Sequence, residues 1–535
     1  MTEGWSYADV WEAVAERFPE APALVHGDRR TTWRSFDERA NGVAHALLAA
    51  GLGHQAKVAQ YQRNSPEYLE VLSACFKASL VPVNTNYRYV DDELRYLWTN
   101  SDAEAVVFDA ELTDTVDRLR DGLPAVRAWL RVGDGAGCPP WATPYEQAAR
   151  SHPERVEGPW GRSGHDLYLL YTGGTTGQPK GVMWRQDDLF RMLELSQGNE
   201  LPDPPDVTAF VGALDRPGVT ALPAAPLMHG TACWFVLPIL SRGGCSVTLP
   251  GHSLDPVELL DATVAHGVKG LCIVGEAFAR PILRELDAAP GRWDLSGLRV
   301  LFSSGAMLGA ESKRRFLHHA PRAKVVDGLG SSESGSLGRS VVDDPDAAGT
   351  ATFKLSPTAR VIDEDGNDVV PGSGERGLLA VGGHLPLGYY GDPEKTAATF
   401  RTIGGRRYVV AGDWATLDED GTITLLGRGS SCINTAGEKV YPEEVEEVLK
   451  AFPGVADAGV VGVPDERFGE AVTAVVQMEP GAELDEAALI AHAKARLAHY
   501  KAPKRVLAAP SFPRGPNGKL DHKALKAQAT AALDA

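Results

Sequence analysis

The sequence predicts an α/β protein with a large N-terminal domain and a small α+β C-terminal domain. The large domain is expected to combine parallel sheets covered by helices with a small β-barrel-like part. Three patterns lead to this prediction. Strand and helix patterns alternate to about residue 340, and short hairpin strands follow after about residue 350. A flexible stretch near residue 430 then precedes a last group of strand and helix patterns. Such alternation favours a parallel sheet covered on both faces. At 535 residues, 43% of them hydrophobic, the chain is too long for one core.

Composition and charge exclude several classes of protein. A net charge of −18 argues against a nucleic-acid binder, which needs a basic face, and against binding to an anionic membrane surface. The first residues lack an export signal, and no apolar run is long enough to span a membrane. The six cysteines are scattered without CxxC spacing, which is typical of reduced core thiols. We therefore expect a cytoplasmic protein whose partners are small molecules.

The first 165 residues begin the alternation. They contain strand patterns at Val58 and Val81 and a hairpin pattern between Ala23 and Trp33. Their helical patterns cover Tyr7–Phe18, Phe36–Leu52 and Ser65–Ser79, and a further one begins at Asp91.

The next segment contains a loop with the composition of a phosphate-binding loop. An apolar strand pattern ending at Tyr171 leads into Thr-Gly-Gly-Thr-Thr-Gly-Gln-Pro-Lys, residues 172–180. Glycines allow backbone N–H groups to close on an anion, hydroxyls donate further hydrogen bonds, and Lys180 adds a positive charge. The loop is not a Walker A motif, because no Gly-Lys-Ser/Thr closes it. The alternative is an ordinary polar loop.

Three further turns are expected at strand ends before residue 340. An apolar strand is predicted to end at His229-Gly230, another at Gly305-Ala306, and a third to lead from Asp327 into a Gly/Ser turn that closes on Glu333. Ligands of open α/β sheets gather at the carboxyl ends of strands. A lone histidine is often only structural, and Ser-Ser-Glu is also a helix N-cap pattern.

After residue 350 the pattern changes to short strands and hairpins. Asp365-Gly366 and Asp420-Gly421 each lie between alternating strand patterns, with Asp413 between them. A small, flexible stretch, residues 427–431, suits a hinge. Helices starting at Tyr441 and Asp485 and strands 455–463 and 471–478 follow it. The chain closes on a Gly/Pro loop with Lys519, which alone indicates only a solvated lysine.

These stretches, in this order, resemble the AMP-forming acyl-CoA ligase family, the adenylate-forming enzymes. The resemblance covers nearly the whole chain, and residues 427–440, Gly-Arg-Gly-Ser-Ser-Cys-Ile-Asn-Thr-Ala-Gly-Glu-Lys-Val, are most similar to the actinobacterial fatty-acyl-CoA synthetase type. It implies domains 1–428 and 432–535, a hinge at 429–431 centred on Ser430, and a mobile C-terminal domain that carries Lys519.

The resemblance also implies a role for each motif residue. Lys519, His229 and Lys180 would be catalytic, and Glu333 and Thr176 would contact Mg²⁺. The phosphates would be held by Thr172, Gly173, Gly174, Thr175, Thr176, Gly177 and, at the α-phosphate, Ser332. Adenine and ribose would contact Gly305, Ala306, Asp327, Gly328, Leu329, Gly330, Ser331, Asp413 and Arg428. CoA would pass Ala436, Gly437 and Glu438.

The implied chemistry activates a carboxylic acid in two steps. The acid attacks the α-phosphorus of MgATP and releases pyrophosphate, and a thiol, expected to be that of CoA, then displaces AMP from the acyl-adenylate. The acid is expected to be aromatic or medium/long-chain. Trp234 and Phe235, which follow His229, would shorten the pocket and favour an aromatic or medium acid over a long chain, although the two rings fit an ordinary core at least as well. An α-amino acid is disfavoured, because Gly230 stands where amino-acid-activating relatives have an aspartate.

Two departures from the family pattern leave alternatives open. Leu329 replaces an aromatic residue that usually stacks on adenine, and Ala436 replaces the first glycine of a pair in the thiol tunnel. The acceptor could therefore be another nucleophile, as in an ATP-dependent diazotase that activates nitrite for an aryl amine. A non-catalytic nucleotide-binding protein is a third hypothesis, disfavoured because Lys180, Glu333, Asp413, Arg428 and Lys519 are all present.

Overall fold

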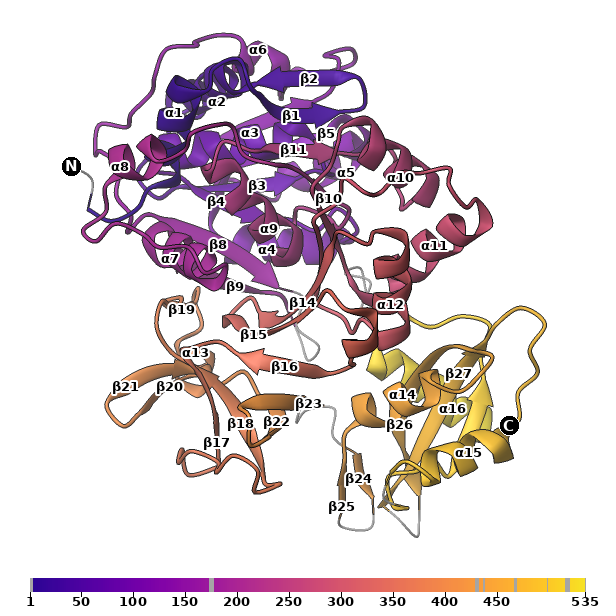
Figure 1. Ribbon diagram of the computed structural model, residues 1–535. Coiled ribbons are helices and arrows are strands. Elements are labelled where there is room, and N and C mark those ends of the chain that lie inside the picture. Colours follow the sequence, from indigo (N-terminus) through magenta and orange to yellow (C-terminus); the bar gives the residue numbers. More distant parts are fainter. Residues whose placement is uncertain are drawn as a thin grey trace. The chain divides into compact units, whose positions relative to one another are not determined.

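The computed structural model (Figure 1) describes residues 3–172, 178–428, 433–435, 438–465, 469–497, 499–514 and 520–534. The chain forms two compact units. The first contains Met1–Ala348 and Gly382–Val409, and the second contains Gly349–Val381 and Val410–Ala535. The predicted α/β class is confirmed by sheets and helices in both units. The predicted boundary at 429–431 lies outside the described residues and stays a prediction.

The first unit contains an eight-stranded sheet with the order β19-β9-β8-β4-β3-β5-β6-β7. Pairing from β4 through β3, β5, β6 and β7 is parallel, as the strand–helix alternation predicts, whereas β8–β9 and β9–β19 are antiparallel. The strands are β19 (Gly388–Tyr389), β9 (Lys180–Arg185), β8 (Leu167–Thr172), β4 (Val81–Asn84), β3 (Lys57–Tyr61), β5 (Ala103–Asp109), β6 (Ala128–Val132) and β7 (Thr143–Pro144).

Helices bury both faces of this sheet. One core is formed with α2 (Trp33–Ala49), α3 (Pro66–Lys77) and α6 (Tyr145–Ala149), and the other with α4 (Asp91–Asn100) and α5 (Thr113–Arg120). Helix α3 starts as its sequence predicts, because the Ser65 hydroxyl accepts the Tyr68 N–H and Pro66 occupies the first turn.

The second sheet of this unit contains the strand ends that the sequence singles out. Its order is β2-β1-β11-β10-β12-β13-β14-β15, with parallel pairing from β1 to β14 and antiparallel hairpins at both ends. The strands are β2 (Arg29–Thr32), β1 (Pro22–His26), β11 (Cys245–Thr248), β10 (Thr220–Pro223), β12 (Gly270–Ile273), β13 (Val300–Ser304), β14 (Lys324–Ser331) and β15 (Gly335–Val342).

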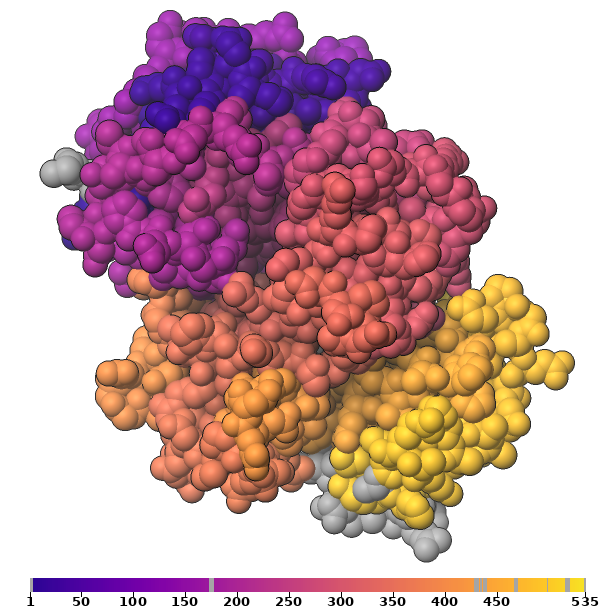
Figure 2. Space-filling view, viewed as in Figure 1, coloured from indigo at the N-terminus to yellow at the C-terminus, as the bar shows by residue number. Residues whose placement is uncertain are grey.

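A large apolar core lies between this sheet and the helices α10 (Pro256–Ala265), α11 (Gly275–Ala288) and α12 (Ala310–His319). The remaining helices of the unit are α1 (Tyr7–Arg17), α7 (Gln186–Ser196), α8 (Val207–Gly212), α9 (Gly230–Ser241) and α13 (Pro393–Thr399), and β20 (Phe400–Ile403) pairs with β21 (Arg406–Val409). Figure 2 shows indigo N-terminal residues beside magenta ones, in keeping with the stacking of Trp5 on Phe190.

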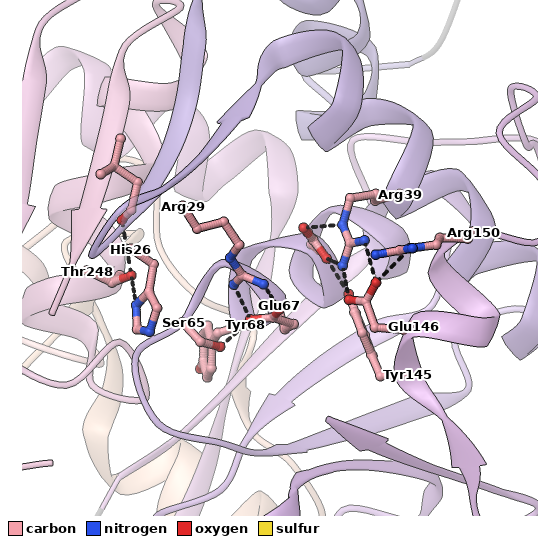
Figure 3. A network of polar contacts seen from close by, with 12 residues as sticks. His26, Arg29, Arg39, Ser65, Glu67, Tyr68, Tyr145, Glu146, Arg150 and Thr248 are labelled. Carbon is pink, nitrogen blue, oxygen red and sulfur yellow. Dashed lines mark hydrogen bonds and ion pairs between the residues drawn. The ribbon is translucent and has the colours of Figure 1, made fainter. Parts of the chain in front are cut away.

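Ion pairs hold the helices α2, α3 and α6 together (Figure 3). Arg39 of α2 donates to both carboxylate oxygens of Glu70 on α3 and to those of Glu146 on α6, and the Tyr145 hydroxyl also donates to Glu70. Next to them Arg29 of β2 forms a bidentate pair with Glu67 of α3. These contacts join α2, α3 and α6 to one another and β2 to α3.

The second unit contains two groups of strands. The first is an antiparallel hairpin group that includes the two predicted Asp-Gly turns: β16 (Thr352–Leu355), β17 (Ala359–Ile362), β18 (Arg376–Val381), β22 (Asp413–Leu417) and β23 (Thr422–Arg428). Gly366 and Gly421 have φ of 89° and 78°, the left-handed conformation that such turns require.

The second group is a five-stranded sheet of order β25-β24-β27-β26, with β28 beside β27, and it confirms the α+β character expected of the C-terminal residues. Its elements are β24 (Ile433–Thr435), β25 (Glu438–Val440), α14 (Pro442–Lys450), β26 (Val455–Asp465), β27 (Gly469–Met478), α15 (Glu486–Lys494), β28 (Arg505–Ala508) and α16 (His522–Asp534). None of the helices in the described part of the chain is long and apolar enough to cross a membrane.

A carboxyl group at the end of β5 gives the first unit a predicted pH dependence. Burial raises the pKa of Asp109 to about 7, and the nearby Glu111 and Glu67 act in the same direction, whereas the hydrogen bond from the Arg63 backbone N–H opposes them. The folded protein therefore keeps a proton on Asp109 that the unfolded chain has lost, so stability falls as pH rises toward the folded-state value.

We therefore expect Asp109→Asn to stabilise the protein more at about pH 8 than at about pH 5, by a difference of about 2–4 kcal/mol. Asparagine keeps an acceptor for the Arg63 N–H but carries no charge. Urea unfolding of both proteins at the two pH values measures the difference, and Asp114→Asn, at an exposed carboxylate of α5, is the control. Parallel pH profiles for wild type and Asp109→Asn would show that Asp109 is ionised in the folded protein.

Candidate functional site around strand β9

Strand β9 organises the site in the first unit. Its first residue, Lys180, pairs with Thr172 at the end of β8, so that the predicted phosphate loop is the connection of an antiparallel hairpin. Residues 173–177 of this loop, with Gly173, Gly174, Thr175, Thr176 and Gly177, lie outside the described residues. The structure therefore positions the two ends of the loop, Thr172 and Lys180.

The Ser/Glu turn lies between β14 and β15 and is not a helix N-cap. Ser331 and Ser334 exchange hydrogen bonds across it, and Glu333 is at its tip. The turn is tight because a Cβ on Gly330 would lie 2.0 Å from the Gly335 carbonyl oxygen, which only glycine avoids. The N-cap interpretation of Ser-Ser-Glu is therefore wrong, because the chain here reverses between two strands.

Two contacts connect this turn to β9 and to its edge partner β19. The Trp184 indole N–H of β9 donates to the Ser332 carbonyl at 2.9 Å. The Tyr389 hydroxyl of β19 donates to Glu333 Oε1 at 2.8 Å, and Tyr389 pairs with Val182 of β9. Lys180 and Trp184 are four residues apart on one strand and face the same way. Ser332 and Glu333 are thus connected, through Trp184 and Tyr389, to β9, the strand that begins with Lys180.

Lys180 has an anionic partner in this structure. Its Nζ is 2.8 Å from Asp392 Oδ2, and the other oxygen of Asp392 accepts the Lys395 backbone N–H at the start of α13. The hydrogen bond from Lys180, together with that backbone N–H, lowers the pKa of Asp392. Both side chains are about one-third exposed, so a more highly charged anion can reach the lysine.

His229 lies directly before α9, in a turn held by two asparagines. The strand β10 ends at Pro223 and not at His229 as the sequence predicts, and His229 is the N-cap residue of α9. Asn64 donates to the Pro223 and Ala225 carbonyls and accepts the Leu227 N–H.

Asn84 of β4 holds the other side of the same turn. It donates to the carbonyls of Met228 and Tyr171 and accepts the Tyr171 N–H. Asn84 thus connects the strand before the phosphate loop with the residue before His229, which places both at the carboxyl ends of the neighbouring parallel strands β4 and β8.

The predicted adenine residues lie at the ends of β13 and β14. Gly305 follows β13 with φ of 87°, and the Ser304 hydroxyl donates to the Gly328 carbonyl. Asp327 is buried, and its Oδ2 is 3.1 Å from Nζ of the fully buried Lys313 on α12. Lys313 therefore holds the Asp327 carboxylate at a defined position in β14.

Aromatic rings surround the first turns of α9. Trp184 and Trp234 meet edge to face with ring centroids 5.6 Å apart, and Phe235 stacks on Phe302 of β13 at 5.7 Å. A Cβ on Gly328 would lie 3.1 Å from Phe302, so the chain is closely packed here. Trp234 and Phe235 are both half-buried.

The second unit brings two predicted ribose residues together. Asp413 begins β22 and Arg428 ends β23, and the two are direct cross-strand partners. The Arg428 side chain is not among those described. Glu438 begins β25, also without a described side chain, and Ala436, Gly437, Ser430 and Lys519 lie outside the described residues, so the predictions for them remain predictions.

Sequence reasoning missed Trp184, Tyr389, Asp392, Asn64 and Asn84. Of these, only Asn84 lies in a stretch noted in the sequence, the strand pattern at Val81 that leads to the helix beginning at Asp91. Within the described ranges, no group of three or more His, Cys, Asp or Glu side chains could hold a metal ion. Glu333 is a single carboxylate, a donor set that fits Mg²⁺ carried by phosphate oxygens better than a metal held by protein alone.

An α/β unit in which a Thr/Gly/Lys hairpin loop begins and ends near a carboxylate-tipped turn is the arrangement expected of a nucleotide-binding enzyme. Comparisons specify the family. Residues 11–390 match the AMP-binding enzyme family model, and residues 444–519 match the model of the AMP-binding enzyme C-terminal domain. The chain therefore belongs to the AMP-binding enzyme family, which confirms the resemblance seen in the sequence.

Relatives match over nearly their full length. The 3-oxocholest-4-en-26-oate–CoA ligase of Rhodococcus rhodochrous is 41% identical over 535 residues, covering 97% of this chain and 95% of the relative. A medium/long-chain-fatty-acid–CoA/3-oxocholest-4-en-26-oate–CoA ligase of Mycobacterium tuberculosis is 39% identical, covering 99% and 97%. ATP-bound MatB of Rhodopseudomonas palustris is 27% identical with a TM-score of 0.82, covering 98% and 99%.

Proposed function

We propose that this protein is an AMP-forming acid–thiol ligase that activates an apolar carboxylic acid with ATP and transfers the acyl group to CoA. The observation that carries the proposal is the arrangement around β9. Lys180, the Ser332 backbone and the Glu333 carboxylate are joined through Trp184 and Tyr389 beside the two ends of a Thr/Gly loop. A cation, hydroxyls and a carboxylate in one place suit a triphosphate with its metal.

Each group has a defined task in the first half-reaction. Lys180 leaves Asp392 and pairs with the β- and γ-phosphates, which are held by the loop from Thr172 to Gly177. Glu333 would bind Mg²⁺, which neutralises phosphate charge when it is present. The acid attacks the α-phosphorus, and pyrophosphate leaves. Positioned cations and N–H groups act where negative charge develops, which is the largest source of acceleration in such sites.

The acid pocket is assigned to the residues next to His229. Asn64 and Asn84 hold the turn before His229, and Asn84 also bonds Tyr171 in the strand that leads to the phosphate loop. His229 would therefore separate ATP from the acyl group. Trp234, Phe235 and Phe302 then form an aromatic wall suited to an apolar group. Relatives at 39–41% identity are named as CoA ligases of fatty and steroid acids, which favours the same class of acid here.

The second unit completes the proposed enzyme. Asp413 would accept from the ribose hydroxyls with Arg428 beside it, and Lys519 would reach the α-phosphate during adenylation. Rotation about 429–431 between domains 1–428 and 432–535 would remove Lys519 and admit the thiol past Ala436, Gly437 and Glu438. Cytoplasmic ATP and CoA are the co-substrates.

Pyrophosphate release over a panel of acids tests the proposal. The panel contains medium- and long-chain fatty acids, a steroid side-chain acid, aromatic acids and nitrite, each with ATP and Mg²⁺. We expect release with at least one apolar carboxylic acid and not with nitrite. Release with nitrite alone would favour the diazotase alternative, and release with no compound would favour a nucleotide-binding protein without catalysis.

A further inference from the structure

We propose that Tyr389 is a positioning residue that orients Glu333 toward the metal and fixes Lys180 toward the phosphates. The inference rests on the proposed function, because it assigns a task in the same nucleotide site. Tyr389 lies 56 residues beyond Glu333, in a different segment of the first unit, and no motif of the site includes it.

Tyr389 itself is held rigidly. It is 6% exposed, pairs with Val182 on the edge of the first sheet, and its backbone N–H donates to the Thr396 hydroxyl at 2.9 Å. Its ring also meets Phe400 edge to face at 5.8 Å. A buried ring with a paired backbone has few alternative positions, so its hydroxyl is a fixed point.

The hydroxyl determines which oxygen of Glu333 faces a ligand. It donates to Oε1 at 2.8 Å, and among the described residues no group donates to Oε2. A carboxylate with one oxygen occupied is prepared to bind Mg²⁺ through the other, in the monodentate mode compatible with octahedral geometry. Hydrogen bonds that orient a metal-binding carboxylate are typically worth about 10–100-fold in metal affinity or activity.

The ring of Tyr389 has a second effect on Lys180. The Lys180 ammonium lies 5.6 Å from the ring centroid, within the range of a cation–π contact, and its other contact is the ion pair with Asp392. Tyr389 and Asp392 are three residues apart in one segment. Residues 389–392 therefore contact Lys180 through the Tyr389 ring and the Asp392 carboxylate. They contact Glu333 through the Tyr389 hydroxyl.

Tyr389→Phe separates the two effects, because it removes the hydroxyl and keeps the ring. Binding is measured for Mn²⁺ together with α,β-methylene-ATP, an analogue that cannot be cleaved at the α-phosphorus. We expect the dissociation constant of Mn²⁺ to rise about tenfold. Binding of the analogue without metal, in EDTA, is expected to stay within about twofold, because the Lys180 contact remains. A residue that is only structural would weaken both.

Tyr390→Phe is the matched control. The Tyr390 hydroxyl also donates to a carboxylate, Asp102 Oδ2 at 2.7 Å, and its ring also lies near a lysine, Lys57. Tyr390→Phe thus removes a phenolic hydroxyl from the neighbouring residue and leaves the hydrogen bond from Tyr389 to Glu333 in place. Mn²⁺ binding is expected to equal that of the wild type.

A double-mutant cycle with Glu333→Gln decides the inference. If the hydroxyl acts through Glu333, then Tyr389→Phe has no further effect on Mn²⁺ binding in the Glu333→Gln background. Unchanged Mn²⁺ affinity in Tyr389→Phe, or equal losses in both backgrounds, would overturn the role of Tyr389. Failure of the wild type to bind Mn²⁺ with the analogue would instead contradict the proposed function.

Discussion

Lys519→Ala is expected to slow pyrophosphate release from ATP and the acid by about 10³-fold, the effect of removing a positioned charge from a developing oxyanion. Lys519 is proposed to approach the α-phosphate and the attacking carboxylate, where negative charge is shared in the transition state. Alanine has no replacement for that charge. Binding of ATP is expected to change little, because the loop from Thr172 to Lys180 and Glu333 are proposed to hold the other phosphates.

The second half-reaction provides the internal control for this variant. Lys519→Ala given a preformed acyl-adenylate and CoA should form the thioester at close to the wild-type rate, since the lysine is proposed to leave before the thiol enters. Lys523→Ala removes an exposed lysine of α16 that lies four residues further along and should leave both steps unchanged. Unaffected pyrophosphate release in Lys519→Ala would show that Lys519 is not catalytic.

Arg39→Ala is expected to lower the free energy of unfolding by about 3–5 kcal/mol, the usual cost of leaving a buried charge without its partner. Glu70 is 1% exposed, and Arg39 supplies both of its charge-assisted hydrogen bonds (Figure 3). Burial already raises the pKa of Glu70 against the opposing effect of Arg39. Without the arginine, folding requires either a buried unpaired carboxylate or proton uptake.

The proton uptake determines how the loss depends on pH. The variant binds a proton on Glu70 in the folded state more strongly than in the unfolded state, so its stability falls with rising pH, and the loss is larger at about pH 8 than at about pH 5. Urea unfolding measures it. Arg34→Ala, which breaks the exposed pair with Glu20, is the control and should cost less than about 1 kcal/mol. Equal losses in the two variants would contradict the role of Arg39.

The helices, strands and turns could be predicted from the sequence because each depends mainly on residues close by in the chain. Apolar periodicity, Ser65 and Pro66 at the start of α3, and the Asp-Gly turns at Gly366 and Gly421 depend on neighbours a few residues away. The end of β10 was misplaced for a related reason. Pro226, Leu227 and Met228 are apolar and resemble a strand, but they form a turn whose hydrogen bonds come from Asn64 and Asn84 elsewhere in the chain.

The supporting residues of the site could not be found in this way. Asn84 is 144 residues from Met228, Trp184 is 148 from Ser332, and Tyr389 is 56 from Glu333. Their contacts depend on which strands become neighbours, and a single sequence does not contain that information in any short pattern. The motif residues were recognisable because glycine, threonine, lysine and carboxylate have phosphate chemistry wherever they lie.

The choice of acid is proposed to depend on the least local part of the site. Trp234 and Phe235 follow His229 closely in sequence, but Phe235 packs against Phe302 on β13, and Trp234 packs against Trp184 on β9. The proposed aromatic wall of Trp234, Phe235 and Phe302 therefore comes from two elements, α9 and β13, and Trp184 of β9 packs against it.

Release of AMP on addition of CoA tests the central claim most directly. Purified protein is incubated with ATP, Mg²⁺ and the best acid of the panel until pyrophosphate release stops at one equivalent of bound adenylate, and CoA is then added. An AMP-forming acyl-CoA ligase releases AMP and forms acyl-CoA in equal amounts and then turns over repeatedly. Adenylate that persists in the presence of CoA, with no thioester formed, would contradict that account and identify an enzyme with another acceptor.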